Sequence, residues 1–167
     1  TGIPPLGAKD GASTGFNQTF RGIDIDLGQG NPGGIGLGFS GAQGSSLEDV
    51  RILARNGYAG IYNVPGRAMG AVNVEVVGGR FGVIVVTEPS PILAGLTLIN
   101  QKERAIKFDG WTPLTLVGFR IVKESSPAVE LLAGGSDIGG SLVLIDGSIE
   151  VKSGAAPAVD NRAGLTM

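Results

Sequence analysis

The chain of 167 residues contains neither cysteine nor histidine. Their absence excludes a disulfide framework, a thiolate or imidazole metal site, and catalysis by a Ser-His-Asp or Cys-His arrangement. Without cysteine, the sequence also gives no information on the redox compartment. Any catalytic prediction therefore has to be built from carboxylates and arginines.

Long apolar runs and blocks of like charge are missing as well. No run approaches the roughly 20 apolar residues that span a bilayer, so no transmembrane segment is predicted. The 13 basic and 15 acidic residues are spread along the chain, with no basic run of the kind that follows a phosphate backbone. We therefore do not expect nucleic acid to be a partner.

Glycine and proline are abundant instead, with 30 and 9 residues. Turns recur every few residues, which argues against long helices and predicts short strands. The hydrophobic fraction of 42% suffices for one domain with a continuous core.

A short pattern recurs six times along the chain: a small or turn-forming residue, then an apolar, a variable and an apolar residue. A second apolar series follows the first at nearly the same steps, mostly 22 to 27 residues and 30 at the last. A fixed period of this length is typical of a solenoid, and neither helical periodicity nor a leucine-rich pattern is present. A β-sandwich would not be expected to hold one register through six units. We therefore predict an all-β fold, a right-handed parallel β-helix of about six coils. The first series begins at Ile23, Val50, Val74, Leu96, Phe119 and Ile149, and the second consists of Ile35, Ile61, Val83, Ile106, Val129 and Val159.

Strict alternation assigns a face to each residue of the first series. The apolar residues face the core, and the residues between them form an outward ladder that largely alternates in charge. Exposed charge is the favoured interpretation of this ladder, ahead of a binding cleft. Asp49 and Asn73 share the turn position with Gly22, Gly95 and Gly118, so a left-handed backbone is expected there. The outward ladder consists of Asp24, Arg51, Glu75, Thr97, Arg120 and Glu150.

A second outward row is apolar in the middle coils: Leu53, Val77, Ile99 and Val122. Either a loop or a partner covers this row, or it bends into the core at a coil corner, and the sequence does not distinguish the two.

The N-terminal residues 1–19 are poorly suited to a strand and are predicted to form a capping or linker segment. Residues 20–167 are assigned to the β-helix, and the strand-like Leu165-Thr166 predicts a helix that continues or is truncated at the C-terminal end. Unpaired strand edges at an open end pair readily with other chains. We expect self-association end to end or through the apolar row.

The stretch from Phe20 to Ile52, FRGIDIDLGQGNPGGIGLGFSGAQGSSLEDVRI, resembles the pectin-lyase-like superfamily, within it the pectate-lyase-3 and family 55-like glycoside hydrolase branch. The resemblance continues as a loose coil pattern to about Val159. It implies polysaccharide as the partner, a secreted or extracellular location, and the activity of a glycoside hydrolase or polysaccharide lyase. It supplies no catalytic residue, because members use aspartates with a histidine, or calcium-binding acidic residues with an arginine base, and neither set matches here.

Asp24, Asp26, Arg51 and Glu75 are the candidate catalytic residues. Asp24 and Asp26 lie on one strand face roughly 7 Å apart, with Arg51 one coil above. Two carboxylates about 5 to 9 Å apart can act as the acid and base of glycoside cleavage. An exposed strand face is nevertheless the favoured interpretation. Two carboxylates are too few to specify a calcium site, so no metal or cofactor is predicted.

Aromatic residues make up only 5% of the chain. Phe108 and Phe119 fall on inward positions and are assigned to the core. Tyr58, Tyr62 and Trp111 fall outward or in turns, where flat rings can stack on sugar faces.

Two functions are therefore carried forward from the sequence. The first is a carbohydrate-associated β-helix module that handles polysaccharide. The second is a non-catalytic structural or assembly solenoid that docks onto other protein chains.

Overall fold

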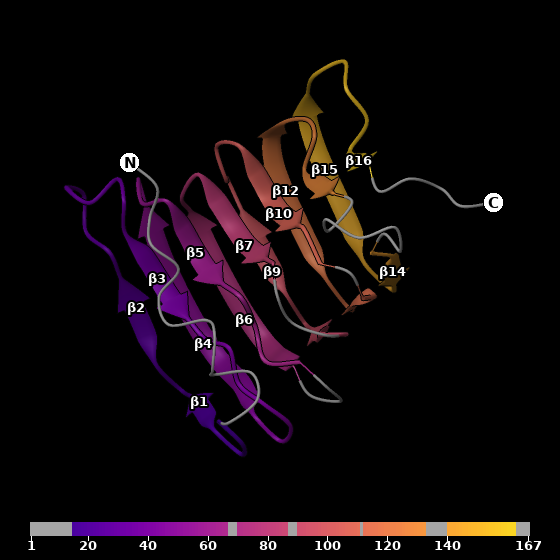
Figure 1. Ribbon diagram of the computed structural model, residues 1–167. Coiled ribbons are helices and arrows are strands. Elements are labelled where there is room, and N and C mark those ends of the chain that lie inside the picture. The colour runs from indigo at the N-terminus through magenta and orange to yellow at the C-terminus, as the bar shows by residue number, and fades with distance from the viewer. Residues whose placement is uncertain (1–14, 67–69, 87–89, 111, 133–139, 163–167) are drawn as a thin grey trace.

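The computed structural model describes residues 15–66, 70–86, 90–110, 112–132 and 140–162. These residues form two parallel sheets, here called sheet A and sheet B, and the chain passes from one to the other in every coil (Figure 1). The predicted all-β parallel β-helix is confirmed, with about five turns that connect six levels of strands. Among the described residues there is no helix long and apolar enough to cross a membrane.

Strands stack in six levels, in the colour order from indigo to yellow in Figure 1. Level 1 holds β1, β2 and β3, level 2 holds β4 and β5, and level 3 holds β6 and β7. Levels 4, 5 and 6 hold β8 to β10, β11 to β13 and β14 to β16. Sheet A contains β1 (Thr19–Arg21), β2 (Asp24–Asp26), β4 (Ser46–Arg55), β6 (Gly70–Gly78), β8 (Ile92–Ala94), β9 (Thr97–Ile99), β11 (Leu114–Val117), β12 (Arg120–Ser125), β14 (Leu142–Ile145) and β15 (Ser148–Ser153). Sheet B contains β3 (Ile35–Gly38), β5 (Ala59–Tyr62), β7 (Phe81–Val85), β10 (Arg104–Phe108), β13 (Val129–Leu131) and β16 (Val159–Asn161).

A left-handed residue interrupts sheet A at the same place in every level. Asp49 and Asn73 both have φ of 53°, as predicted, and Gly22, Gly95 and Gly118 have φ between 61° and 67°. One left-handed residue between two extended segments lets side chains on both flanks face the core. Asn73 Nδ2 donates a hydrogen bond of 2.9 Å to Asp49 Oδ1. The two side chains therefore also link levels 2 and 3.

The core consists of apolar ladders that run along the helix axis. Val50, Val74, Leu96 and Phe119 lie above one another on sheet A and are each at most 5% exposed. Phe108 on sheet B is fully buried, as expected. Stacking at about 4.8 Å pairs the backbone of neighbouring levels and excludes water from these ladders.

The predicted register is wrong by two residues in level 6. Ile149 pairs with Ile121 and not with Phe119, and Asp146, with φ of 49°, takes the left-handed position. Gly147 lies opposite Phe119, whose ring occupies the space that a Cβ of Gly147 would need. Because strand alternation has a period of two, a shift by two residues preserves the apolar pattern and cannot be detected from it.

The same ambiguity affects the outward ladder and the second series. Ser148, not Glu150, continues the ladder above Arg120, and Glu150 pairs with Val122. In level 1 the partner of Ile61 is Leu37 and not the predicted Ile35.

The terminal levels are less buried than expected. Ile23, assigned to the core, is 44% exposed, and Leu144 in β14 is 40% exposed. Levels 1 and 6 each have a neighbouring level on one side only within the described residues, so half of the ladder contact is missing there.

The predicted domain boundary at residue 20 falls inside β1, which begins at Thr19 and pairs with β4. Residues 1–14 of the predicted capping segment and the strand-like Leu165-Thr166 lie outside the described residues.

Candidate functional site

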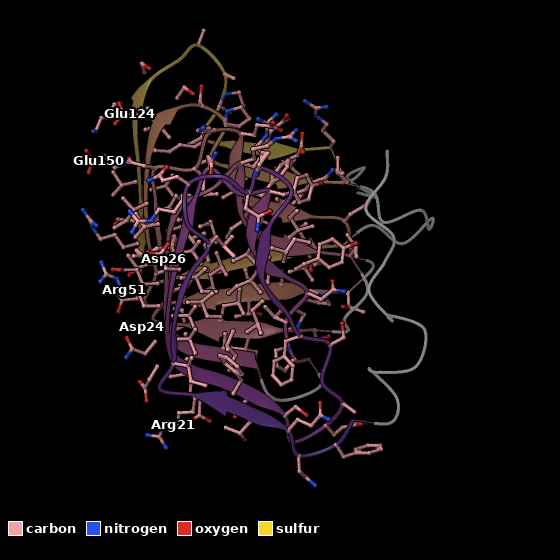
Figure 2. The ribbon with its side chains drawn as sticks, turned by 90° about the vertical axis from the view of Figure 1, so that its left-hand side faces the viewer. Arg21, Asp24, Asp26, Arg51, Glu124 and Glu150 are labelled. Atoms are coloured by element: carbon pink, nitrogen blue, oxygen red, sulfur yellow. The ribbon has the colours of Figure 1, made fainter. Side chains whose placement is uncertain are left out.

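The four candidate catalytic residues lie on the outer face of sheet A within three levels. Arg51 in β4 pairs with Asp24 in β2 on one side and with Glu75 in β6 on the other. Asp26 follows two residues after Asp24. Figure 2 shows Asp24, Asp26 and Arg51 projecting from the same side of the molecule. The expected placement of Arg51 one level above Asp24 is therefore found.

Three of these four residues form ion pairs. Arg51 Nε donates to Glu75 Oε1 at 2.6 Å. Arg55 holds Asp26 with two hydrogen bonds, Nε to Oδ1 at 3.0 Å and NH2 to Oδ2 at 2.7 Å. These bonds, together with the Gly28 N–H, lower the pKa of Asp26 to about 2. A carboxyl group with this pKa is ionised at neutral pH and cannot donate a proton as a general acid.

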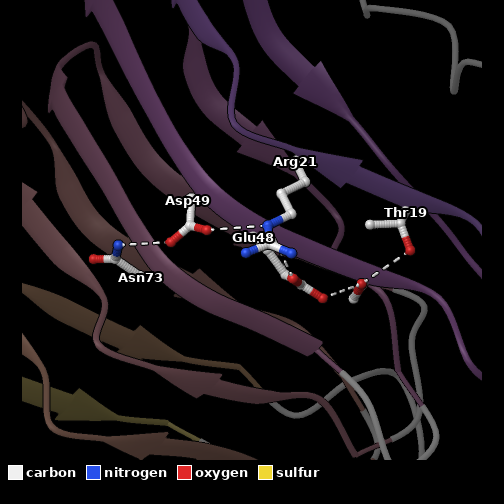
Figure 3. Close-up of polar contacts among 6 residues, drawn as sticks. Thr19, Arg21, Glu48, Asp49 and Asn73 are labelled. Carbon is white, nitrogen blue, oxygen red and sulfur yellow. Dashed lines mark hydrogen bonds and ion pairs between the residues drawn. The ribbon is translucent and has the colours of Figure 1, made fainter.

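A polar network continues along the same sheet towards β1 (Figure 3). Arg21 Nε contacts Asp49 Oδ2 at 3.2 Å and Glu48 Oε2 at 3.6 Å. The hydrogen bonds from Asn73 and Arg21 lower the pKa of Asp49. The Ser46 hydroxyl donates to Glu48 at 2.6 Å and lies 3.2 Å from the Thr19 hydroxyl. These polar groups satisfy one another and link the first three levels.

Metal-binding geometry is missing from the part of the chain that the structure describes, which contains no group of three or more acidic residues able to hold an ion. Two of the candidate acids on sheet A, Asp26 and Glu75, already form ion pairs with Arg55 and Arg51.

A second group of candidates lies on the outer face of sheet B. Tyr62 is the last residue of β5, and Tyr58 immediately precedes that strand. Tyr58 meets Phe81 of β7 edge to face, with ring centroids 5.3 Å apart and an interplanar angle of 62°. Burial raises the pKa of Tyr62, and Tyr58 adds to the shift. Two of the three predicted sugar-stacking aromatics therefore share one face, and Trp111 lies outside the described residues.

Two cationic side chains lie close to these rings. The Arg80 guanidinium lies 5.3 Å from the centroid of Tyr58 and 5.8 Å from that of Phe81, and Lys107 Nζ lies 5.8 Å from the Phe81 centroid. Arg80 Nε also donates to Glu103 Oε1 at 2.6 Å. We call Tyr58, Tyr62, Phe81, Arg80 and Lys107 the aromatic cluster. Phe81 is 6% exposed and packs against Tyr58, whereas the partly exposed Tyr58 and Tyr62 offer ring surface beside hydrogen-bond donors, the combination that recognises a sugar.

The charged residues on the outer face of sheet B were not predicted from the sequence. Glu130 in β13 is 9% exposed and lies 3.4 Å from Arg104 NH2 and 3.8 Å from Arg162 NH2, and Asp160 of β16 is 2.7 Å from the same Arg162 nitrogen. In levels 2 to 6, the residue that follows each member of the second series points outward. This rule could have identified the row of outward residues from the sequence. The row consists of Tyr62, Ile84, Lys107, Glu130 and Asp160.

The predicted apolar row on sheet A is only partly exposed. Leu53, Val77 and Ile99 are half-buried, and Val122 is 8% exposed. Asp26 and Glu150 pair with the two ends of the row, so it is bounded by acidic residues.

A more exposed apolar strip lies on the other half of sheet A, at β6, β8 and β14. We define the apolar strip by its most exposed members, which are 40% to 51% exposed: Val72, Ile92, Val143 and Ile145.

No protein-family model, curated protein or solved structure matches the chain. The fold is established by the structure itself.

Proposed function

We propose that the chain is a carbohydrate-associated β-helix module that binds polysaccharide through the aromatic cluster on sheet B. The observation that carries the proposal is the gathering of Tyr58 and Tyr62 on one face beside Arg80 and Lys107. Ring faces contact the apolar face of a sugar, while guanidinium and carboxylate groups bind its hydroxyl groups.

We propose binding through sheet B rather than cleavage of polysaccharide by the candidate catalytic residues on sheet A. Glu75 is tied to Arg51, and Asp26, with a pKa of about 2, has no proton to donate near neutral pH. A glycoside hydrolase requires an acid that is protonated at its working pH. The resemblance of Phe20 to Ile52 to the pectin-lyase-like superfamily supports the polysaccharide context, and secretion is part of the same proposal.

Binding isotherms and affinity electrophoresis with neutral and acidic polysaccharides test this function. The double variant Tyr58→Ala/Tyr62→Ala is expected to lose at least tenfold in affinity for the polymer that the native chain retains. Phe16→Ala is the matched control, since Phe16 is 52% exposed and is not in the aromatic cluster. Equal affinity of the double variant and the control would reject the site, and no binding to any polymer would reject the function.

The second candidate function is that of an assembly solenoid, and the apolar strip favours it. Its four side chains are all exposed on the outer face of sheet A, where other solenoids or protein chains can pack. The exposed core positions Ile23 and Leu144 at the terminal levels favour association end to end in the same way.

Sedimentation velocity over a concentration series separates these modes of self-association. A lower sedimentation coefficient of Ile145→Lys relative to the native chain would assign self-association to the apolar strip. Association that persists in this variant would assign it to the terminal levels or to the apolar row of Leu53. A strictly monomeric native chain at high micromolar concentration would remove self-association altogether.

A further inference from the structure

Lys123 is a lysine in the protein interior. It belongs to β12 and is 1% exposed. Among the described residues no carboxylate forms an ion pair with it. Burial lowers the pKa of Lys123, and the positive charge of Arg104 lowers it further. A buried ammonium group costs free energy unless other groups replace its water.

Oxygen atoms at the corner after β12 take the place of that water. Lys123 Nζ donates to the Ser125 carbonyl oxygen at 2.6 Å and lies 3.3 Å from the Ser125 hydroxyl and 3.4 Å from the Lys102 carbonyl oxygen. Lys102 follows β9 in level 4, whereas Ser125 ends β12 in level 5. The ammonium group therefore joins two successive levels at the point where the chain leaves sheet A.

The same corner is filled one level lower by an uncharged donor. Gln101 is 2% exposed, and its Nε2 donates to the carbonyl oxygens of Val76, Gly78 and Ile99 at 3.0, 3.1 and 3.0 Å. Carbonyl groups at this corner therefore face inward in successive levels and require a side-chain donor, because a buried carbonyl group without one is unfavourable.

We propose that the corner between levels 4 and 5 is a cation-binding site that Lys123 fills with its own ammonium group. Its ligands are the carbonyl oxygens of Lys102 and Ser125 and the Ser125 hydroxyl. When the side chain is shortened, the site binds a small primary alkylammonium ion, which carries N–H donors and an apolar tail like those of the lysine.

The variant Lys123→Ala tests the site, with propylammonium chloride as the probe. Propylammonium has the three carbons and the ammonium group that the substitution removes. Thermal unfolding of Lys123→Ala is expected several degrees below that of the native chain, with a midpoint that rises and saturates as propylammonium is added. Tetramethylammonium chloride at equal concentration has no N–H donor and is expected to give no such rise.

Two further variants serve as controls. Lys102→Ala removes an exposed lysine at the same corner and is expected to unfold near the native midpoint, with no response to propylammonium. Lys123→Met keeps most of the side-chain volume and removes the donor, so it is expected to be destabilised and not restored by the probe.

Three results would overturn the proposal. These are native stability of Lys123→Ala, native stability of Lys123→Met, and a rise in the Lys123→Ala midpoint that is absent or equal for the two salts. If Lys123→Ala does not fold, acetylation of amines in the native chain decides. Lys123 is expected to react at least tenfold more slowly than Lys102, and equal rates would show that its ammonium group is not held in the site.

Discussion

Replacing Leu96 by alanine measures how much one buried side chain of a core ladder contributes to the free energy of unfolding. Leu96 is 1% exposed and lies between Val74 of level 3 and Phe119 of level 5. The substitution removes three carbon atoms, and their transfer to water accounts for about 2.4 kcal/mol at ~0.8 kcal/mol per methylene group. A cavity cost adds to this value, because the neighbouring strands are held in place by backbone pairing and cannot close the gap.

The expected loss for Leu96→Ala is therefore about 3 to 5 kcal/mol, within the range of buried leucine truncations. The free energy of unfolding is measured by urea denaturation followed by circular dichroism. Val72→Ala is the matched control, because Val72 lies on the outer face of β6 and is 51% exposed. Its loss is expected to stay below about 1 kcal/mol. A loss for Leu96→Ala no larger than that of the control would refute the assigned register.

Three other predictions concern the surface and the end of the β-helix. Arg51→Ala is expected to lower the free energy of unfolding by less than about 1 kcal/mol, because its ion pair is exposed. A larger loss that persists in high salt would show that the pair is buried. The Asp26 pKa of about 2 lies below the ordinary 3.8, so its stabilisation is complete above about pH 4 and lost as the pH falls towards 2. In Arg55→Ala the urea midpoint should fall less between pH 5 and pH 2 than in the native chain, and equal slopes would contradict this assignment. Gly147→Ala should cost about 1 to 3 kcal/mol because the new Cβ meets the Phe119 ring. Phe119→Leu should recover part of this loss in a double-mutant cycle, and strict additivity would argue against the contact.

The sequence by itself determined the architecture of this protein. Two apolar series with a common period predict stacked coils, because a strand can bury one face only if the neighbouring coil repeats its pattern. The left-handed positions at Asp49 and Asn73 were also predictable, since short polar side chains and glycine adopt that backbone at lowest cost. Alternation likewise placed Asp24 and Arg51 on neighbouring levels of one face.

Only the tertiary structure decided the register at the two ends. A period of two cannot distinguish Ile149 opposite Phe119 from Ile149 opposite Ile121, and the choice depends on the left-handed Asp146 and on the fit of Gly147 to a large ring. The contact between Gly147 and Phe119 joins residues far apart in the sequence, so local patterns do not reveal it.

Partner choice among charged and aromatic side chains was also decided in three dimensions. Asp26 looked like a free acid in the sequence, yet Arg55, 29 residues away, binds it. Tyr58 gained Phe81 as a neighbour because both lie on the outer face of sheet B in successive levels. Lys123 had no distinguishing mark in the sequence, since its burial depends on the chain turning inward at the corner after β12. Alternation gives the face on which a residue lies, whereas only the packed coil determines which atoms meet there.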